Sequence, residues 1–307
     1  MKNIMLILQG GFIMNIREFH YFHELVKYKN FSQVASFFNV SQPTITMAIK
    51  RLETELEVKL FVRDRSHKQL VVTPSGEQLD RHVTQILNEL EVMKKELARI
   101  SSEKVMFGLP PIIGTYYFPH VAPELLRAGL IDKLDIFESG SNEMLNYIID
   151  GTLDLALIGS ITPIVDSKLD AKIFNRTHFK IAVSEKHPLA QQKSVNFKEL
   201  AQEKFIILDD RFIHSIAFSK MCHANQFRPQ IIHRSNDVHI LKAMIKENMG
   251  ISFLTELALP PEAGIKVLDI ADADQPEFLL SLVYRHSHML TQLQQRLIEI
   301  LPQKINL

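Results

Sequence analysis

The stretch at residues 41–53, SQPTITMAIKRLE, constrains the fold most, because it has the pattern of a helix with one buried face. Ser41 is a preferred helix N-cap, and Pro43 falls in the first turn, where its missing N–H costs no hydrogen bond. No further Pro or Gly interrupts the run. Apolar residues then follow at spacings of four and three: Ile45, Ile49 and Leu52. We therefore predict a helix whose opposite side faces outward.

The outward side of this helix carries side chains that suit a DNA major groove. They are Gln42, Thr44, Met47, Lys50 and Arg51. Gln can bond to an adenine edge, Thr and Met can contact a thymine methyl group, and Lys and Arg can reach phosphates. The preceding residues 31–40, FSQVASFFNV, predict a shorter helix and a tight turn. Together the two segments predict a helix-turn-helix, with an ordinary helical hairpin as the alternative.

A basic β-hairpin is predicted next. Two short apolar runs, at residues 60–62 and 70–72, flank a polar loop. Three basic residues of this segment would meet a phosphate backbone or minor groove, as a wing: Arg63, Arg65 and Lys68. A solvated surface loop is the alternative. Residues 14–76 hold nine basic and six acidic residues, whereas the whole chain holds 35 of each, so nucleic-acid binding is favoured for this part alone.

A long helix should begin at Thr73 and Pro74, a capping residue followed by a first-turn proline. Its apolar residues alternate at spacings of four and three: Leu79, Val83, Ile86, Leu90, Met93, Leu97 and Ile100. This heptad seam of about three repeats predicts pairing with a second copy of the chain, which would set two recognition helices about one DNA turn apart. A helix packed along its own domain is the alternative.

From residue 103 the strands and helices alternate, which predicts an α/β domain of two Rossmann-like lobes. We expect the first lobe at residues 103–170 and 265–307, and the second at residues 171–264. Ligands of such lobes bind at the carboxyl ends of the strands, in the cleft between the lobes. This rule selects Pro111, Ile112, Thr115, Ser139, Ser141, Ser160, Arg211, Phe212, His214 and Ser235. Their hydroxyls, the helix N–H groups and one guanidinium favour a small anion, unless they serve only as caps.

Several motifs resemble those of the LysR-type transcriptional regulators. FSQVASFFNVSQP, ITMAIKRLE, LFVR and VVTPSG occur in this order within residues 15–76. The family usually has two alanines in the second helix and a serine within the recognition helix; this chain has Val34 with Ala35, and Thr46. Further along, GTLDLALIG, EKHPLA and ENMGISFLTE resemble the effector-binding region of the family, which is similar in fold to periplasmic binding proteins.

The resemblance implies a winged helix-turn-helix at residues 14–73, a linker helix at 74–102 and an effector-binding domain at 103–307. It implies a homodimer or homotetramer that binds a pseudo-palindromic operator in double-stranded DNA, responds to a small effector and contacts RNA polymerase, without a cofactor. The DNA-binding residues would be Ser32, Ser41, Gln42, Pro43, Thr44, Thr46, Met47, Lys50, Arg51, Arg63, Arg65 and Lys68. RDRSHKQLVVTPSG and GLPPIIGTYYFP resemble the subgroup that regulates malolactic fermentation, which implies malate or another carboxylate as effector.

Two other classes of protein are the alternatives to this interpretation. An enzyme is disfavoured because the 13 histidines come without an HExxH, paired-cysteine, phosphate-loop or GxSxG motif, although His286 and His288 leave a metal site open. A solute-binding transport component would need export and would leave the basic helix pair without a task. The single cysteine, Cys222, fits a reducing cytoplasm as an inert buried thiol. Residues 1–13 should be a disordered tail, or precede a working start at Met14, being too short to span a membrane.

Overall fold

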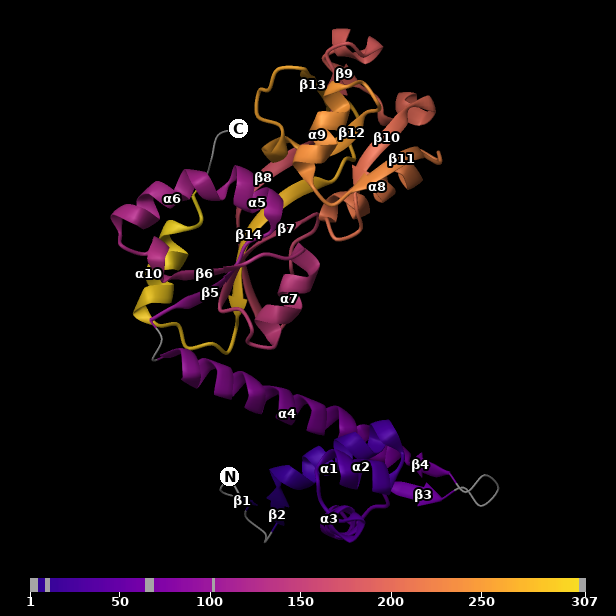
Figure 1. Cartoon of the computed structure of the whole chain (residues 1–307), viewed down its shortest axis with the longest axis vertical. Helices are drawn as coiled ribbons and strands as arrows, with labels where there is room; N and C mark the ends of the chain where they lie inside the picture. Colours follow the sequence, from indigo (N-terminus) through magenta and orange to yellow (C-terminus); the bar gives the residue numbers. More distant parts are fainter. Residues whose placement is uncertain (1–4, 9–11, 64–68, 101–102, 304–307) are drawn as a thin grey trace. The chain divides into compact units, whose positions relative to one another are not determined.

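The computed structural model describes residues 5–8, 12–63, 69–100 and 103–303. The chain divides into two compact units, Met1–Lys94 and Lys95–Leu307 (Figure 1). Each unit has its own hydrophobic core.

Three short helices form the centre of the first unit: α1 (Ile16–Tyr28), α2 (Phe31–Phe37) and α3 (Gln42–Glu55). Side chains of Asn15, Asn30 and Ser41 cap these helices by accepting hydrogen bonds from first-turn N–H groups. Asn39 has φ 53°, a left-handed conformation that Asn tolerates, and this makes the tight turn between α2 and α3. The predicted helix-turn-helix is therefore present.

Two antiparallel hairpins accompany these helices. The predicted wing is β3 (Phe61–Arg63) paired with β4 (Leu70–Val72). The other hairpin, β1 (Met5–Leu8) with β2 (Phe12–Asn15), lies where we expected a disordered tail. The hairpin forms because two apolar runs pair there, from Met5 opposite Asn15 to Leu8 opposite Phe12. The backbone N–H and C=O groups of each strand hydrogen-bond with those of the other.

Helix α4 (Pro74–Ile100) starts against the wing and runs on into the second unit. Thr73 fixes its start, because its hydroxyl accepts from the Gly76 N–H at 3.0 Å and donates to the Lys59 carbonyl at 2.6 Å. Gly76 lies so close to the preceding chain that a Cβ there would stand 2.5 Å from the Leu60 carbonyl oxygen. The TPSG sequence is thus explained by the close contact between α4 and the wing.

The second unit is built on a sheet of order β6-β5-β7-β14-β8-β13-β9, with β12 also paired to β8. Its strands are β5 (Val105–Gly108), β6 (Leu134–Phe137), β7 (Leu155–Ser160), β8 (Leu169–Ser184), β9 (Ser194–Val195), β12 (Ser252–Thr255), β13 (Ile265–Ile270) and β14 (Glu277–Arg285). Strand β5 pairs in parallel with β6 and β7, whereas β14 runs antiparallel to β7 and β8. The first lobe therefore has the parallel α/β arrangement that we predicted.

Helices cover both lobes (Figure 1). Those of the first lobe are α5 (Pro111–Tyr116), α6 (Phe118–Arg127), α7 (Ser141–Ile149) and α10 (Gln292–Ile300). The second lobe adds the parallel pair β10 (Lys204–Leu208) and β11 (Gln230–Ser235) with α8 (Ile213–Ala224) and α9 (Val238–Lys246). Short 3-10 helices lie at Ile131–Lys133, Pro188–Gln191, Phe197–Gln202 and Glu256–Ala258.

The boundary between the lobes differs from our expectation. Strand β8 is continuous through both lobes, pairing with β14 up to His178 and with β12 from Phe179 onward. Strand β13, which we assigned to the first lobe, pairs with the second part of β8 and with β9 and so belongs to the second lobe. The chain returns to the first lobe only at β14. Our expectation was wrong at β13 because a sequence pattern indicates that a strand exists but not which strand it pairs with.

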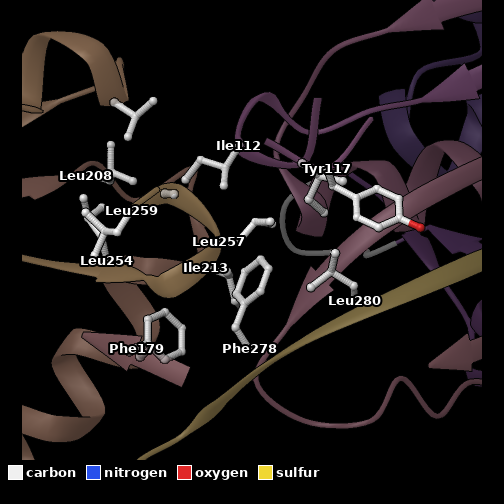
Figure 2. Close-up of a cluster of buried hydrophobic side chains, with 14 of the residues drawn as sticks. Ile112, Tyr117, Phe179, Leu208, Ile213, Leu254, Leu257, Leu259, Phe278 and Leu280 are labelled. Atoms are coloured by element: carbon white, nitrogen blue, oxygen red, sulfur yellow. The ribbon is translucent and has the colours of Figure 1, made fainter. Parts of the chain in front are cut away.

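The core of the second unit extends through both lobes. In Figure 2 the side chains of Ile112, Ile213 and Phe278 converge where the lobes meet, and Phe179 stands near Phe278 with ring centroids 5.9 Å apart. At the far side Tyr117 donates a hydrogen bond to the Leu301 carbonyl at 2.6 Å, and burial raises its pKa to about 12. The two lobes thus share one continuous apolar core.

Gly76→Ala should destabilise the first unit by about 1–3 kcal/mol, because the added methyl overlaps a backbone carbonyl that cannot move away cheaply. Alanine is intrinsically better in a helix by about 1 kcal/mol, so a net loss would come from the clash. Urea unfolding measures the change, with Ser75→Ala at the exposed neighbouring position as the control. Equal stability of the two variants would disprove the close contact.

Candidate DNA-binding surface and ligand pocket

The exposed side of α3 presents the side chains predicted to contact DNA. Gln42, Thr44, Met47 and Lys50 are exposed, and Met47 is 53% exposed although it is apolar. The opposite side is buried in the core of the first unit through Ile45, Ala48, Ile49 and Leu52. The four-and-three spacing therefore separated the two sides of the helix correctly.

Hydrogen bonds at the start of α3 hold several of the predicted hydroxyls. The Ser41 hydroxyl lies 2.9 Å from that of Thr44, and the Ser32 hydroxyl donates to Gln42 Oε1 at 3.3 Å. Thr46 donates to the Gln42 carbonyl at 3.1 Å. Pro43 is exposed and has no N–H to offer. The donors left for a partner at this end are chiefly the Gln42 amide N–H groups.

A groove runs between α3 and the wing, with about 620 Å³ of empty space that is open to solvent. Its lining residues are Phe31, Gln42, Thr46, Ile49, Lys50, Glu53, Phe61, Val62 and Leu70. The groove brings Gln42 and Lys50 to one surface with the strands of the wing. Arg63 ends β3, but its side chain lies outside the described part of the chain, as do Arg65 and Lys68. Their predicted phosphate contacts stay predictions.

Arg51 makes a contact that the sequence did not reveal. Its guanidinium pairs with Glu18 of α1 at 2.6 Å and donates a second hydrogen bond from Nε at 2.7 Å. Glu18 is 5% exposed, and burial raises its pKa against the lowering effect of the Arg51 hydrogen bond. Arg51 therefore ties α3 to α1, in addition to any phosphate contact.

The apolar residues of the α4 heptad seam lie in two different environments, one buried and one exposed. Val83 is fully buried in the core of the first unit, against which Leu79 and Leu90 pack. The seam residues with exposed side chains are Ile86, Met93 and Leu97, at 41%, 42% and 61%. The side chain of Ile100 lies outside the described residues. One half of the seam thus packs against its own domain. The other half forms an apolar stripe on α4 that has no partner in the core of the first unit.

A narrow pocket, partly open to solvent, lies at the junction of the two lobes, with a cavity volume of about 20 Å³. Six of the ten residues selected from sequence line it: Pro111, Ile112, Ser141, Arg211, Phe212 and His214. The sequence reasoning missed Pro110, Ile113, Gly140, Ile213 and Phe278.

Two of the missed residues show why the pocket forms. A Cβ on Gly140 would lie 2.5 Å from the Arg211 carbonyl oxygen, so the two lobes approach each other there by backbone contact. Phe278 comes from β14, far along the chain. The glycine before a predicted helix was a usable signal, whereas nothing in the local sequence indicated Phe278.

Four selected residues do not line the pocket: Thr115, Ser139, Ser160 and Ser235. The hydroxyls of the three serines all donate hydrogen bonds to acceptors within the chain. Ser139 donates to Glu143, Ser160 to the Thr162 carbonyl at 2.8 Å, and Ser235 to the Asp237 carbonyl at 2.8 Å. These serines act as turn and cap residues, which was the alternative to ligand binding.

Two helices begin at the pocket with uncapped ends. Neither Gly140 before α7 nor Phe212 before α8 makes a side-chain cap hydrogen bond, so no cap side chain competes with an anion for the first N–H groups of these helices. Arg211 stands beside them, but its guanidinium binds both carboxylate oxygens of Asp209, at 2.8 to 3.2 Å. That hydrogen bond, together with the Arg211 charge, lowers the pKa of Asp209 despite some burial.

His214 is the polar side chain most deeply enclosed at this junction. It is 3% exposed, and its ring lies 5.5 Å from Phe179, 6.4 Å from Phe212 and 5.7 Å from Phe278. Within the described residues neither ring nitrogen has a hydrogen-bond partner. Burial lowers its pKa to about 3, so the free protein holds a neutral imidazole at neutral pH.

The two histidines that left a metal site open have other neighbours. His286 Nδ1 lies 3.0 Å from Asp170, and His288 lies between Glu96 of α4 and Gln294 of α10. The described part of the chain contains no group of three or more side chains suited to hold a metal ion.

Replacing Arg51 by Ala should lower the free energy of unfolding by about 1–2 kcal/mol, because Glu18 then stays buried without its cation. This loss of unfolding free energy should reach its full size above the raised pKa of Glu18. It should shrink as the pH falls towards 4.5, because a protonated Glu18 carries no charge to bury. Urea unfolding at several pH values measures this, with Lys50→Ala as the exposed control. A pH-independent loss, or an equal loss in both variants, would contradict the role of the ion pair.

None of the described helices is both long and apolar enough to cross a lipid bilayer. Two family profiles match the chain: "Bacterial regulatory helix-turn-helix protein, lysR family" over residues 16–77 and "LysR substrate binding domain" over residues 99–305. The malolactic fermentation system transcriptional activator of Lactococcus lactis subsp. lactis is 32% identical over 289 residues, covering 94% of this chain and 98% of that protein.

Other relatives agree with this match. The hydrogen peroxide-inducible genes activator of Haemophilus influenzae is 29% identical over 279 residues, covering 89% of this chain and 91% of that protein. The structure of a C206 mutant of Corynebacterium glutamicum OxyR superposes with a TM-score of 0.55 at 19% identity, covering 94% of this chain and 91% of that one. At this identity the superposition shows the shared fold alone.

These matches confirm the family expected from the motifs, and they exclude the enzyme alternative, because LysR-type proteins are transcriptional regulators. Members of the family bind DNA, form oligomers and bind small-molecule effectors. A transport component is not supported, since the DNA-binding profile covers the first unit. The chain belongs to the LysR family of DNA-binding transcriptional regulators, with an N-terminal helix-turn-helix and a C-terminal effector-binding domain.

Proposed function

We propose that the protein reads a pseudo-palindromic operator by placing α3 in the major groove. The observation that carries this proposal is the exposed face of α3, where Gln42, Thr44 and Met47 stand beside Lys50. Gln42 would contact an adenine edge, and Thr44 and Met47 would contact thymine methyl groups. Lys50, at the groove beside the wing, would bind a phosphate, and most of the affinity would depend on salt.

Two copies of the chain would pair through α4. The support is the exposed half of the seam, where Ile86, Met93 and Leu97 recur at seven and four residues with no partner in their own chain's core. An unpaired apolar stripe of this kind is costly in water, so a second helix would stabilise it. Pairing would set two recognition helices on one side of the DNA. We propose that this dimer, or a tetramer of it, acts in the cytoplasm, where DNA and RNA polymerase are.

The effector would be a small carboxylate bound in the pocket between the lobes. Support comes from the starts of α7 and α8, which lack side-chain caps, and from the polar lining residues Ser141, Arg211 and His214. The name of the Lactococcus relative points to malolactic fermentation, which makes malate the first compound to test. The carboxylate would be held chiefly by helix N–H groups, because Asp209 already binds Arg211.

A ligand signal would reach α4 through charged contacts at its end. Lys95 donates to the Asp150 carbonyl and to Thr152, each at 2.9 Å, and Arg99 binds the 5%-exposed Asp154 at 2.9 Å. Asp154 also accepts from a β5 N–H at 2.8 Å, so the contact extends to the sheet.

A third contact joins the same helix end to the C-terminal part of the lobe. Glu96 binds both Arg285 and His288. Burial disfavours its ionised form, but these two hydrogen bonds outweigh burial and leave the pKa of Glu96 below its usual value. Three charged residues of α4, namely Lys95, Glu96 and Arg99, thus fasten the end of the helix to the first lobe, and movement of this lobe would displace the helix.

Peroxide sensing is the second candidate function, because several relatives are named as hydrogen peroxide-inducible genes activators. The structure disfavours it. The only cysteine, Cys222, is 6% exposed, and burial raises its pKa to about 12. Peroxide oxidises the thiolate, and this thiol has almost none at neutral pH. We therefore propose that this chain responds to a bound ligand rather than to oxidation.

Replacing Lys50 by Ala should weaken binding to every DNA sequence and lower the salt slope of the affinity by about one, because one phosphate contact is lost. Gln42→Ala should instead reduce discrimination at one base position by about 1–3 kcal/mol. Fluorescence anisotropy on a selected operator and its single-base variants distinguishes these effects. Lys266→Ala, an exposed charge change in the effector domain, is the control. A uniform loss in both α3 variants would refute the division of roles.

Cys222 should stay reduced when the folded protein is treated with hydrogen peroxide, because its thiol is buried and protonated. The measurement is the fraction of thiol that can be alkylated after the peroxide is removed and the protein is unfolded. Protein treated in urea should lose this thiol readily and serves as the positive control. Oxidation of folded protein together with a change in operator affinity would favour the peroxide sensor.

A further inference from the structure

The junction between the lobes holds a polar group without a partner. His214 is the second residue of α8, lines the pocket and is 3% exposed. Among the described residues neither Nδ1 nor Nε2 makes a hydrogen bond. A buried imidazole normally has both nitrogens satisfied, and a group left unpaired at a pocket is a candidate for contact with a ligand.

Three phenylalanine rings lie around His214. Phe179 of β8 and Phe278 of β14 pack against the ring, and Phe212 precedes it in the chain. The only charged residue in the pocket lining is Arg211, whose guanidinium is held by Asp209 and also feels the charge of Glu143 from α7. In the described residues no acceptor or negative charge contacts the imidazole, so nothing stabilises its charged form.

An anion in the pocket would reverse this balance. The uncapped starts of α7 and α8 already favour a carboxylate, and α8 begins one residue before His214. A carboxylate close to the ring would favour the imidazolium, because a buried ion pair with a hydrogen bond removes most of the penalty of burying either charge alone. Without a bound anion the ring stays neutral.

We propose that His214 selects a small carboxylate in this pocket by hydrogen-bonding to it, and that carboxylate binding brings one proton from the solvent onto the His214 ring. This inference rests on the proposed effector chemistry and adds regulation by pH to it. In the bound state the imidazolium N–H donates to the carboxylate, and the proton leaves when the ligand leaves. Effector affinity therefore rises as pH falls.

The sign of the effect follows from the two protonation states. In the free protein the pKa of His214 is about 3, and the bound carboxylate raises it. Between these two values binding takes up about one proton, so the dissociation constant falls by up to about tenfold for each unit of pH lowered. The change should be seen from about pH 8 down to about pH 5, the range in which histidines usually titrate.

Isothermal titration calorimetry of the full chain with L-malate and with succinate, in two buffers of different ionisation enthalpy, counts the protons taken up. The wild-type protein should take up close to one proton per pocket, and His214→Asn should take up none and lose the pH dependence. His223→Asn, an exposed histidine of the same helix, is the matched control and should behave as wild type. The wild-type proton count stands even if His214→Asn does not fold.

The outcomes separate this inference from the proposed function. Carboxylate binding without proton uptake, or uptake that persists in folded His214→Asn, overturns the role of His214 and leaves the effector class in place. Failure of both acids to bind overturns the inference and the carboxylate effector together. Operator binding by the same preparation, measured by anisotropy, then still supports the DNA-binding function.

Discussion

Strand β8 is the backbone element that both lobes of the effector domain share. Up to His178 it pairs with β14 in the first lobe, and from Phe179 it pairs with β12 in the second. The change of partner lies next to the pocket, because Phe179 and Phe278 both contact the ring of His214. A ligand that drew the lobes together, as proposed, would act at the point where the shared strand passes from one lobe to the other.

The rest of the proposed mechanism follows from this constraint. The first lobe is bound to the end of α4 by Lys95, Glu96 and Arg99, and α4 begins against the wing through Thr73 and Gly76. In the proposed mechanism a displacement at the C-terminal end of α4 would pass along the helix, as it would not along a flexible linker. Paired copies would then change the spacing of their recognition helices, and operator affinity would respond to the ligand.

Local features of this chain could be predicted from its sequence. The apolar spacing of α3, the capping residue Ser41 and the tight turn before it depend on neighbours within a few residues, so their pattern is readable. The rule that ligands bind at the carboxyl ends of strands also found most of the polar residues of the pocket.

Features that depend on distant partners could not be predicted in this way. The pairing of β13 with β8, the contact of Arg51 with Glu18, and the entry of Phe278 into the pocket each join residues far apart in the chain. A serine at a strand end looks the same whether it binds a ligand or closes a turn, and Ser160 and Ser235 close turns. The enclosure of His214 is visible only after three phenylalanine rings from separate segments are in place.

A hydroxyl-radical footprint on DNA selected from genomic fragments tests the central claim most directly, namely that paired α3 helices read DNA under the control of a carboxylate. The account predicts two symmetric protected half-sites on one face of the duplex, about one helical turn or a whole number of turns apart, whose extent changes when L-malate or succinate is added. A single unsymmetric protected patch, unchanged by both acids, would contradict it.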